Sequence, residues 1–463
     1  MTQNAIIWLR NDLRVTDNPA LRAAVAHGPT TAIYIEETDA SLRQRGAASR
    51  WWLHQSLKVL ARDLAERGVA LETLRGPAEQ TVLDAVDRHD AAAVFWNRRY
   101  APAERALDAR IKTALHDAGV TAESYPGNVL VEPFDIETGG GKPYSVYSPF
   151  WKALKGRDIP TPQRRPDRHE AIDAPSVDTD YTAPSWSAKL ADHWQIGEAA
   201  AQDRLDHFLE ELVADYPDGR DIPAKDVTSR LSPHLAFGEI SARQIWHTAQ
   251  TVAQAHPEKA SAIDKFLSEL AWRDFNHVQL YHREDIATVP MVDKYAAMEW
   301  RDDPDGLEAW QKGRTGLPIV DAGMRELWET GVMHNRVRML AASLLVKNMM
   351  IDWRLGERWF WDTLVDADAA SNPGNWQWVA GSGLDAAPYF RIFNPVVQGE
   401  RFDPAGDYVR RWVPEVKDLP DKWVHKPAEA PEDVKRKIAG DYPAPIVDLK
   451  ASRERALAAM KAL

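Results

Sequence analysis

The chain has 463 residues, of which 44% are apolar and 27% charged, and its formal net charge is −12. Since domains typically hold ~100–200 residues, two or three domains are expected, and this composition is ordinary for a globular protein. The absence of cysteine excludes disulfides, thiolate metal sites and cysteine nucleophiles. The start lacks a signal-peptide pattern and no apolar run approaches ~18 residues, so we expect a cytoplasmic protein without a membrane span. The acidic charge disfavours uniform nucleic-acid binding but leaves room for a local basic face.

The N-terminal part alternates between two kinds of segment. Short β-rich runs cover residues 5–9, 30–35, 69–74 and 92–97. Amphipathic segments follow them near residues 18–27, 49–67, 78–89 and 102–118. This alternation predicts a parallel, Rossmann-like α/β sheet in a first domain, residues 1–130. The first run is followed by RNDLRVTDN and not by a glycine-rich fingerprint, so no dinucleotide site is expected there.

The remaining chain changes texture twice. Prolines and charges without a sustained period between residues 155 and 200 predict a long connector, which we place at 131–200. Beyond it the pattern is helical and rich in tryptophan to about residue 380, followed by a proline-rich, partly charged tail. We therefore expect an all-helical domain over residues 201–463. The predicted fold class is α/β plus all-α.

The stretch TSRLSPHLAFG, residues 228–238, supplies hydroxyls at the predicted start of a helix. Thr228, Ser229 and Ser232 stand where free backbone N–H groups can bind a phosphate. An ordinary N-cap explains the same pattern. Upstream, YPDGRD forms a turn with Tyr216 and Arg220 at its ends.

Two helical stretches place polar and soft groups on one face. In ELAWRDF, Glu269, Trp272 and Arg273 have the spacing i, i+3, i+4, although a glutamate and an arginine so spaced also form ordinary surface bridges. In HNRVRM, Asn335 and Met339 share a face with residue 338 at the start of an apolar helix. An exposed first turn with a core methionine is the alternative for the second stretch.

No metal site is expected in this region. His334 has no second histidine at ligand spacing, so a structural role is favoured for it.

The stretch DADAASNPGNWQW, residues 366–378, combines a helix start with two tryptophans. Asn372 followed by Pro373 is typical of an N-cap and N1 pair, with Asp366 and Asp368 just upstream. If the segment is helical, Trp376 and Trp378 lie about 200° apart and must have different neighbours.

The order of these motifs resembles the photolyase and cryptochrome family. The resemblance covers residues 6 to about 403 and rests on the following stretches: WLRNDLRVTDNPAL, GRDIPAKDVTSRLSPHLAFGEIS, FLSELAWRDF, TGVMHNRVRMLAASLLVKNMMIDWRLGERWF and NWQWVAGSGLDAAPYFRIFNPVVQGERFD. It implies an N-terminal α/β domain, a connector and a helical domain that holds FAD.

The resemblance also implies roles for individual residues. The flavin phosphate site comprises Tyr216, Thr228, Ser229, Arg230, Leu231 and Ser232. Other FAD contacts are Arg273, Arg338, Asp366, Ala367, Asp368 and Asn372, with Asn372 facing flavin N5. The pocket for a flipped lesion comprises Glu269, Trp272, Asn335, Met339 and Trp378. Further DNA contacts are Arg220, Arg336 and Gln398. The relay that carries an electron from the surface to the flavin comprises Trp300, Trp353 and Trp376.

These roles imply repair of cyclobutane pyrimidine dimers in UV-damaged DNA, with Glu269, Asn335, Met339, Asn372 and Trp378 as catalytic residues. We expect Glu269 to share a hydrogen bond with a pyrimidine carbonyl, its protonation favoured by burial. Hydrogen bonding by Asn372 is expected to stabilise the reduced flavin. The protein is expected to be a monomer.

The choice within the family follows from single residues. The (6-4) branch carries a pair of catalytic histidines where this chain has Asn335 and Met339, and plant-type cryptochromes usually carry aspartate where it has Asn372. Stretches 45–57 and 139–154 resemble the bacterial class III branch, with class I as the alternative. A signalling flavoprotein without repair activity remains an alternative function. A light-independent flavoprotein oxidoreductase is disfavoured by the missing glycine fingerprint.

An antenna chromophore is also implied. Glu104 in PAERALD resembles a folate-contacting glutamate, although Ala103 stands where folate-binding relatives commonly have asparagine. Methenyltetrahydrofolate is favoured over a deazaflavin.

Overall fold

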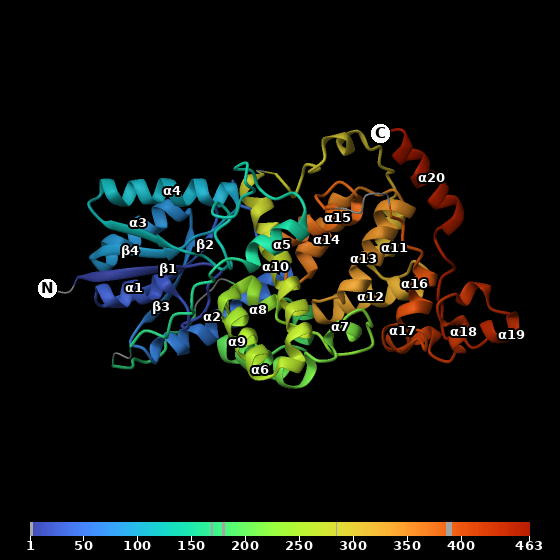
Figure 1. Cartoon of the computed structure of the whole chain (residues 1–463), viewed down its shortest axis with the longest axis horizontal. Coiled ribbons are helices and arrows are strands. Elements are labelled where there is room, and N and C mark those ends of the chain that lie inside the picture. Colours follow the sequence, from blue (N-terminus) through green and yellow to red (C-terminus); the bar gives the residue numbers. More distant parts are fainter. Residues whose placement is uncertain (1–2, 168–169, 178–180, 284, 386–390) are drawn as a thin grey trace. The chain divides into compact units, whose positions relative to one another are not determined.

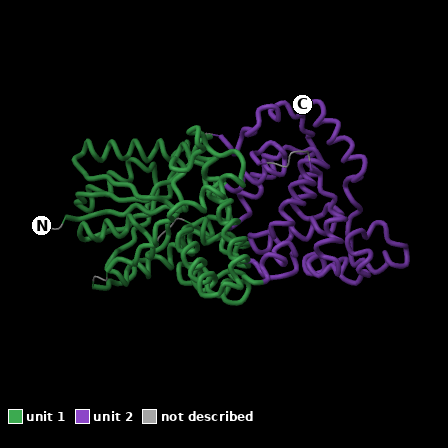
Figure 2. Tube along the Cα trace, in the orientation of Figure 1, with its two compact units in different colours: residues 1–214, 229–284, 366–370 green, residues 215–228, 285–365, 371–463 purple. Residues whose placement is uncertain are grey.

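The computed structural model describes residues 3–167, 170–177, 181–283, 285–385 and 391–463. The chain forms two compact units (Figure 2). Unit 1 comprises residues 1–214, 229–284 and 366–370, and unit 2 comprises residues 215–228, 285–365 and 371–463. The three domains predicted from the sequence stay a prediction, because compactness alone does not define a domain boundary.

The sheet of unit 1 has five parallel strands in the order β3-β2-β1-β4-β5. The strands are β1 (Asn4–Leu9), β2 (Thr30–Glu37), β3 (Ala70–Gly76), β4 (Ala91–Asn97) and β5 (Thr121–Tyr125). The predicted α/β architecture is thus confirmed. The sequence did not predict β5, because this edge strand reads TAESY and buries only Ala122.

Helices cover both faces of this sheet (Figure 1), and both faces are apolar, as a parallel sheet covered in this way requires. Ile6 and Trp8 of β1 pack on one face with Trp96 of β4, in a core that also contains residues of α3 and α4. The intervening Ile7 of β1 and Phe95 of β4 are buried as well. Successive side chains of a strand point to opposite faces, so one apolar run supplies two cores.

Helices complete unit 1. They are α1 (Pro19–His27), α2 (Ala47–Ala65), α3 (Ala78–His89), α4 (Pro102–Asp117), α5 (Tyr147–Lys155), α6 (Glu198–His207), α8 (Ser232–Phe237), α9 (Ala242–Ala255) and α10 (Ala260–His282). Shorter helical turns are η1 (Ser185–Asp192), η2 (Phe208–Leu212) and η3 (Pro257–Lys259). The predicted helical character of residues 269–275 is confirmed by α10.

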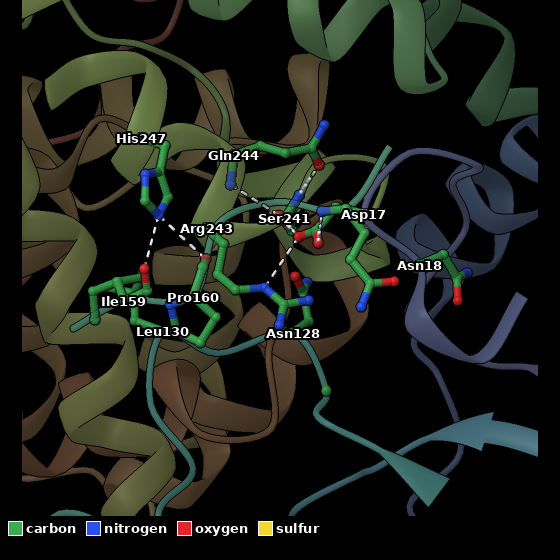
Figure 3. Close-up of polar contacts among 12 residues, drawn as sticks. Asp17, Asn18, Asn128, Leu130, Ile159, Pro160, Ser241, Arg243, Gln244 and His247 are labelled. Carbon is green, nitrogen blue, oxygen red and sulfur yellow. Dashed lines mark hydrogen bonds and ion pairs between the residues drawn. The ribbon is translucent and has the colours of Figure 1, made fainter. Parts of the chain in front are cut away.

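A polar network fixes α9 within unit 1 (Figure 3). The carboxylate of Asp17 accepts hydrogen bonds from Ser241 Oγ at 2.5 Å and Arg243 Nε at 3.1 Å. Ser241 and Gln244 form a capping box at the start of α9. His247 Nε2 lies 2.9 Å from the carbonyl oxygen of Ile159, which attaches the connector to the same helix. Such contacts explain why residues 229–284 belong to the same compact unit as the sheet.

A glycine permits another close approach in unit 1. Gly238 has a φ of 68° at the end of α8, and a Cβ there would lie 2.0 Å from the carbonyl oxygen of Asn11. Arg14, which is buried, donates through Nη1 to the Gly238 carbonyl oxygen at 2.9 Å. Glycine alone fits this position.

Unit 2 is helical in the part of the chain that the structure describes. Its helices are α7 (Tyr216–Gly219), α11 (Pro304–Gln311), α12 (Pro318–Thr330), α13 (Asn335–Ser343), α14 (Trp353–Thr363), α15 (Ser371–Ala380), α16 (Pro395–Phe402), α17 (Asp407–Trp412), α18 (Asp421–Val424), α19 (Glu432–Lys435) and α20 (Leu449–Lys461). Shorter turns are η4 (Asp293–Ala297), η5 (Leu344–Asn348, a π-helix), η6 (Pro414–Val416) and η7 (Pro427–Glu429). Helix α12 packs against α13 and α17, and α15 packs against α13 and α14.

The proline-rich tail is more ordered than its composition predicts. Pro395, Pro414 and Pro427 stand in the first positions of α16, η6 and η7, where proline needs no N–H partner. Helix α20 contacts η5, and its Ser452 accepts a hydrogen bond from Asn348. Across the described ranges, no helix is long and apolar enough to span a bilayer.

Candidate functional site

In unit 1, the start of α8 meets a segment far away in the sequence. Ser232 Oγ donates to Asp366 Oδ2 at 2.7 Å. The N-cap position is held by Leu231, without a side-chain cap, so the ordinary N-cap reading of this stretch is wrong. Arg230 has a φ of 50°, and its guanidinium lies over the Trp194 ring at 4.6 Å. Two residues that are predicted to contact FAD, Ser232 and Asp366, are therefore hydrogen-bonded to each other.

A second polar group in unit 1 joins α10 to the same segment. Arg273 donates through Nη1 to the carbonyl oxygen of Asn128. His277 Nδ1 lies 2.9 Å from the Arg273 carbonyl oxygen, and its Nε2 lies 3.7 Å from Asp368 Oδ2. Burial lowers the pKa of His277 and, although the Asp368 carboxylate opposes this effect, the neutral imidazole is favoured.

Asp274, next to Arg273, anchors the chain that leaves the sheet. Its Oδ1 accepts from the backbone N–H of Leu130 at 2.6 Å. Burial raises the pKa of Asp274 to about 6, above its ordinary value. This carboxyl therefore changes charge near neutral pH although the motif analysis gave it no role.

The residues of unit 1 that are predicted to line a lesion pocket lie on α10 and are partly accessible. Glu269 Oε1 pairs with Lys265 Nζ at 2.8 Å, and 27% of the Glu269 side chain is exposed. Glu269 thus has a basic partner one turn earlier on α10, and its protonation by burial stays a prediction. Trp272 is half-buried and stacks on Tyr147, with ring centroids 3.8 Å apart and planes inclined by 8°.

In unit 2, α13 presents its predicted face as expected. Asn335 is exposed and Met339 half-buried, whereas Val337 and Leu340 are buried. The helix begins with a cap, because His334 Nδ1 accepts from the backbone N–H of Arg336 at 3.2 Å. Burial lowers the pKa of His334 to about 4, so the ring is neutral and able to accept at neutral pH.

Both arginines of α13 have protein partners. Arg336 Nη2 pairs with Asp221 Oδ2 at 2.6 Å, and its guanidinium lies 4.3 Å from the centre of the Phe402 ring. Arg338 Nε donates to the Met333 carbonyl oxygen at 2.7 Å. A DNA phosphate would therefore compete with Asp221 for Arg336.

Asn372 differs from its predicted role as a helix cap. Helix α15 begins at Ser371, so Asn372 lies inside its first turn. Its Nδ2 donates to the carbonyl oxygen of Glu357 at 3.0 Å and to Glu357 Oε1 at 2.8 Å. Both residues are buried. Because both amide protons are directed to Glu357, the Oδ1 acceptor faces elsewhere.

The two tryptophans of α15 have different surroundings, as predicted. Trp376 is buried, and its ring lies 5.0 Å from Phe360 and 6.1 Å from Trp310, edge-on to both. Trp378 is half-buried, and its Nε1 donates to the Asp385 carbonyl oxygen at 3.1 Å. Between them, Gln377 is completely buried.

The other predicted relay tryptophans show graded exposure. Trp353, at the start of α14, is buried, and Trp300 is half-buried. One turn after Trp353, a Cβ on Gly356 would lie 2.2 Å from Cη2 of Trp376, so the two helices meet at a glycine. The backbone N–H of Arg301 donates to the Met350 carbonyl oxygen at 2.7 Å, which attaches the segment of Trp300 just before α14.

The remaining predicted residues have mixed surroundings. In unit 2, Tyr216 is buried beneath the Arg220 guanidinium at 5.4 Å, and Thr228 and Gln398 are half-buried. In unit 1, Ala367 is buried, and Ser229 accepts from Arg204 through its carbonyl oxygen. Glu104 caps α4 by accepting from Ala101 N at 3.3 Å, and burial raises its pKa.

Four residues that contact or adjoin the predicted site residues were not predicted from the sequence motifs. They are Tyr147, His277, Glu357 and Gln377. Gln377 accepts from Met291 N at 2.7 Å and donates to the Ile286 and Val289 carbonyl oxygens, which fixes α15. A polar residue between two helical tryptophans was the available signal for it. The described residues contain no group of acidic and histidine side chains suited to a metal.

Comparisons with known proteins agree with this arrangement. Residues 5–167 match the family of DNA photolyase, and residues 266–462 match the FAD binding domain of DNA photolyase. A deoxyribodipyrimidine photo-lyase of Agrobacterium fabrum is 47% identical over 100% of this chain and 98% of its own length. The chain belongs to the photolyase and cryptochrome family.

Structural similarity extends over the same length. A bacterial class III photolyase from Agrobacterium tumefaciens superposes with a TM-score of 0.94 and 47% identity, covering 100% of this chain and 98% of the other. Cryptochrome-1 of Arabidopsis thaliana is 34% identical over 97% of this chain and 69% of its own length. The family includes both repair enzymes and cryptochromes, so residues must separate the two activities.

Proposed function

We propose that this protein is a light-driven DNA repair enzyme that splits cyclobutane pyrimidine dimers with one electron from photoexcited, reduced FAD. The observation that carries the proposal is the accessible face of α10. There Glu269 and Trp272 lie one turn apart, both partly exposed, while Leu270 and Ala271 beside them are buried. A carboxylate beside an aromatic face offers a hydrogen bond and a stacking surface to a flipped pyrimidine pair.

The residues present fit the proposed cofactor. In unit 1, the Ser232 hydroxyl, the Asp366 and Asp368 carboxylates and the Arg273 guanidinium offer the donors and acceptors that phosphate, ribose and flavin ring atoms need. Arg338 and Asn372 of unit 2 would contribute further contacts, as would Tyr216 and Thr228. We assign FAD binding to these residues together with Ser229, Arg230, Leu231 and Ala367.

Asn372 indicates which redox state of the bound flavin the protein favours. Its Nδ2 protons are held by Glu357, so the amide offers an oxygen acceptor to whatever faces it. Flavin N5 bears a hydrogen only in reduced forms, and an acceptor therefore favours those forms. Asparagine at this position thus supports an enzyme that keeps its cofactor reduced, as repair requires.

The proposal also assigns three residues of unit 2 to lesion binding. Asn335 and Met339 share the accessible face of α13, and Trp378 is partly exposed on α15. An amide, a polarisable thioether and an aromatic ring suit a planar, damaged base pair. Outside the pocket, Arg220, Arg336 and Gln398 would contact the DNA backbone.

The tryptophans Trp376, Trp353 and Trp300 would conduct an electron to oxidised flavin. Trp376 and Trp353 are both buried, whereas Trp300 is half-buried. An oxidised tryptophan at the surface can be reduced by solutes, so the greater exposure of Trp300 suits a relay that ends at solvent.

The antenna is proposed to be methenyltetrahydrofolate, with a deazaflavin as the alternative. Glu104 would contact it only by sharing the carboxylate that now caps α4. We further propose a cytoplasmic monomer of class III, without a resident metal.

Repair of a defined substrate tests the proposal. Purified, reduced holoprotein is illuminated with UV-treated oligothymidine, and loss of dimers is followed by absorbance. We expect dimers to disappear in the light and to persist in darkness. Dimers that survive illumination, with flavin photoreduction intact, would support the alternative of a signalling flavoprotein.

A further inference from the structure

Tyr147 covers one face of the proposed stacking residue. It opens α5, is buried, and its ring lies parallel to that of Trp272, with centroids 3.8 Å apart and an interplanar angle of 8°. Most aromatic pairs in this unit are tilted or edge-on, including Trp272 with Phe275 at 87°. A ring has two faces, and Tyr147 occupies one of those of Trp272.

The tyrosine is itself held in place. Its hydroxyl donates to the Ser268 carbonyl oxygen and lies 3.1 Å from Ser268 Oγ, one turn before Trp272 on α10. Phe275 meets its ring edge-on at 87°, and Phe150 lies 6.3 Å from it. Burial raises the pKa of Tyr147, so the hydroxyl remains protonated and able to donate. Both the position and the tilt of the ring are therefore fixed from α10.

We propose that Tyr147 is a positioning residue for lesion binding: it fixes the plane of Trp272 and leaves only the opposite face of that ring for a flipped base. This inference rests on the proposed function, because it requires Trp272 to stack the lesion. A stacking surface that is rigid before binding loses less entropy when a base arrives, so the affinity for the flipped base is higher. Tyr147 would act through Trp272, without touching the DNA.

Two variants separate the ring from the hydroxyl. Tyr147→Leu removes the parallel ring, and Tyr147→Phe keeps the ring but removes the bonds to Ser268. Dark binding of reduced holoprotein to UV-treated oligothymidine is measured for each. Since stacking on one base is worth ~1–3 kcal/mol, we expect about a tenfold loss of affinity in Tyr147→Leu. A smaller loss is expected in Tyr147→Phe.

Readouts that a general structural defect would move are measured beside it. Flavin content, photoreduction rate and affinity for undamaged oligothymidine should all stay at wild-type values. Tyr144→Leu is the matched control, because Tyr144 contacts Phe150, with ring centroids 6.1 Å apart, from the same segment. That control should bind the damaged oligonucleotide like wild type.

Trp272→Leu distinguishes failure of this inference from failure of the proposed function. If Trp272→Leu weakens binding and Tyr147→Leu does not, the positioning role is overturned while the lesion pocket stands. If neither weakens binding, Trp272 is not the stacking residue and both ideas fall. Should Tyr147→Leu lose its flavin, Tyr147→Phe decides alone, and wild-type affinity in that variant overturns the role of the anchored ring.

Discussion

Two aromatic groups, one in each unit, use tryptophan in opposite ways. In unit 1, Trp272 is half-buried and stacks parallel to a single tyrosine. In unit 2, Trp376 is buried and meets Phe360 and Trp310 edge-on. A partly exposed ring with one covered face can accept a ligand, whereas a ring enclosed by others can exchange only electrons with its surroundings. The surroundings of each tryptophan, and not its identity, would thus divide the proposed lesion binding from the proposed electron relay.

The largest expected effect tests whether the enclosed ring, Trp376, conducts electrons to the flavin. Trp376→Phe should abolish nearly all photoreduction of oxidised flavin, because phenylalanine is much harder to oxidise than tryptophan. Repair by enzyme that is reduced beforehand should remain almost unchanged. Both rates are measured by absorbance under blue light.

The control for this variant is Trp96→Phe, the same change at a buried ring of the sheet core. It should leave photoreduction at the wild-type rate. Equal losses of photoreduction and repair in Trp376→Phe would contradict the relay.

Acid provides a second test in unit 2, because a half-buried histidine, His334, caps the helix that bears Asn335 and Met339. The pKa of His334 is about 4 when folded, lowered chiefly by burial, whereas a free histidine titrates near 6.5. Between these values the unfolded chain binds a proton that the folded chain does not. The free energy of unfolding should therefore fall by up to about 3 kcal/mol as pH drops from about 6.5 to about 4.

Asp221, Arg336 and Arg338 face this histidine, and the first opposes the effect of the other two. His334→Asn keeps a cap and removes the titration, so urea unfolding of this variant should lose that part of the pH dependence. His116→Asn, at an exposed histidine of α4, should unfold with the wild-type profile. A wild-type slope in His334→Asn would assign the acid sensitivity to other groups.

On the side of unit 1, Glu269 tests whether the partly exposed face binds the lesion. Glu269→Ala should lower affinity for damaged DNA and repair yield by about tenfold, since hydrogen bonds to charged groups contribute ~1.5–3 kcal/mol. Flavin content, measured by absorbance, should not change. Lys265→Met, which removes the ion partner but keeps the carboxylate, should have a smaller effect. Flavin loss in Glu269→Ala would mark the residue as structural.

The smallest expected effect concerns the positive charge of Arg336, which we propose contacts the DNA backbone. Arg336→Ala should weaken DNA binding evenly across sequences and lower the slope of log affinity against log salt by about 1. Asp221→Asn frees Arg336 from its 2.6 Å ion pair and should change affinity in the opposite direction. Binding at several salt concentrations checks both. An unchanged slope in Arg336→Ala would remove this residue from the DNA contacts.

Local patterns predicted the parts of the fold that depend on neighbours in sequence. The alternating β-rich and amphipathic segments gave four of the strands and the helices between them, because the period of apolar residues determines which face is buried. The opposite faces of Trp376 and Trp378 followed from helical geometry alone. The order of the motifs predicted a family that binds FAD, and the match of residues 266–462 to the FAD binding domain of DNA photolyase confirms it.

Those local patterns could not predict contacts between segments that are distant in the sequence. Tyr147 lies 125 positions before Trp272, and no local period links a residue in the connector to a helix so far along the chain. Asn372 carried every local signal of an N-cap, yet a buried partner, Glu357, takes both of its protons. Tertiary hydrogen bonding outweighed the local preference.

The interleaving of the two units limits how the polypeptide can be dissected. The chain passes between them at residues 214/215, 228/229, 284/285, 365/366 and 370/371. A cut at any one of these points leaves at least one fragment with residues of both units. A fragment ending at residue 214, for example, lacks α8, α9 and α10, which complete unit 1. Split-gene expression and fragment complementation must therefore reassemble whole cores, and neither unit can be cloned as one contiguous piece.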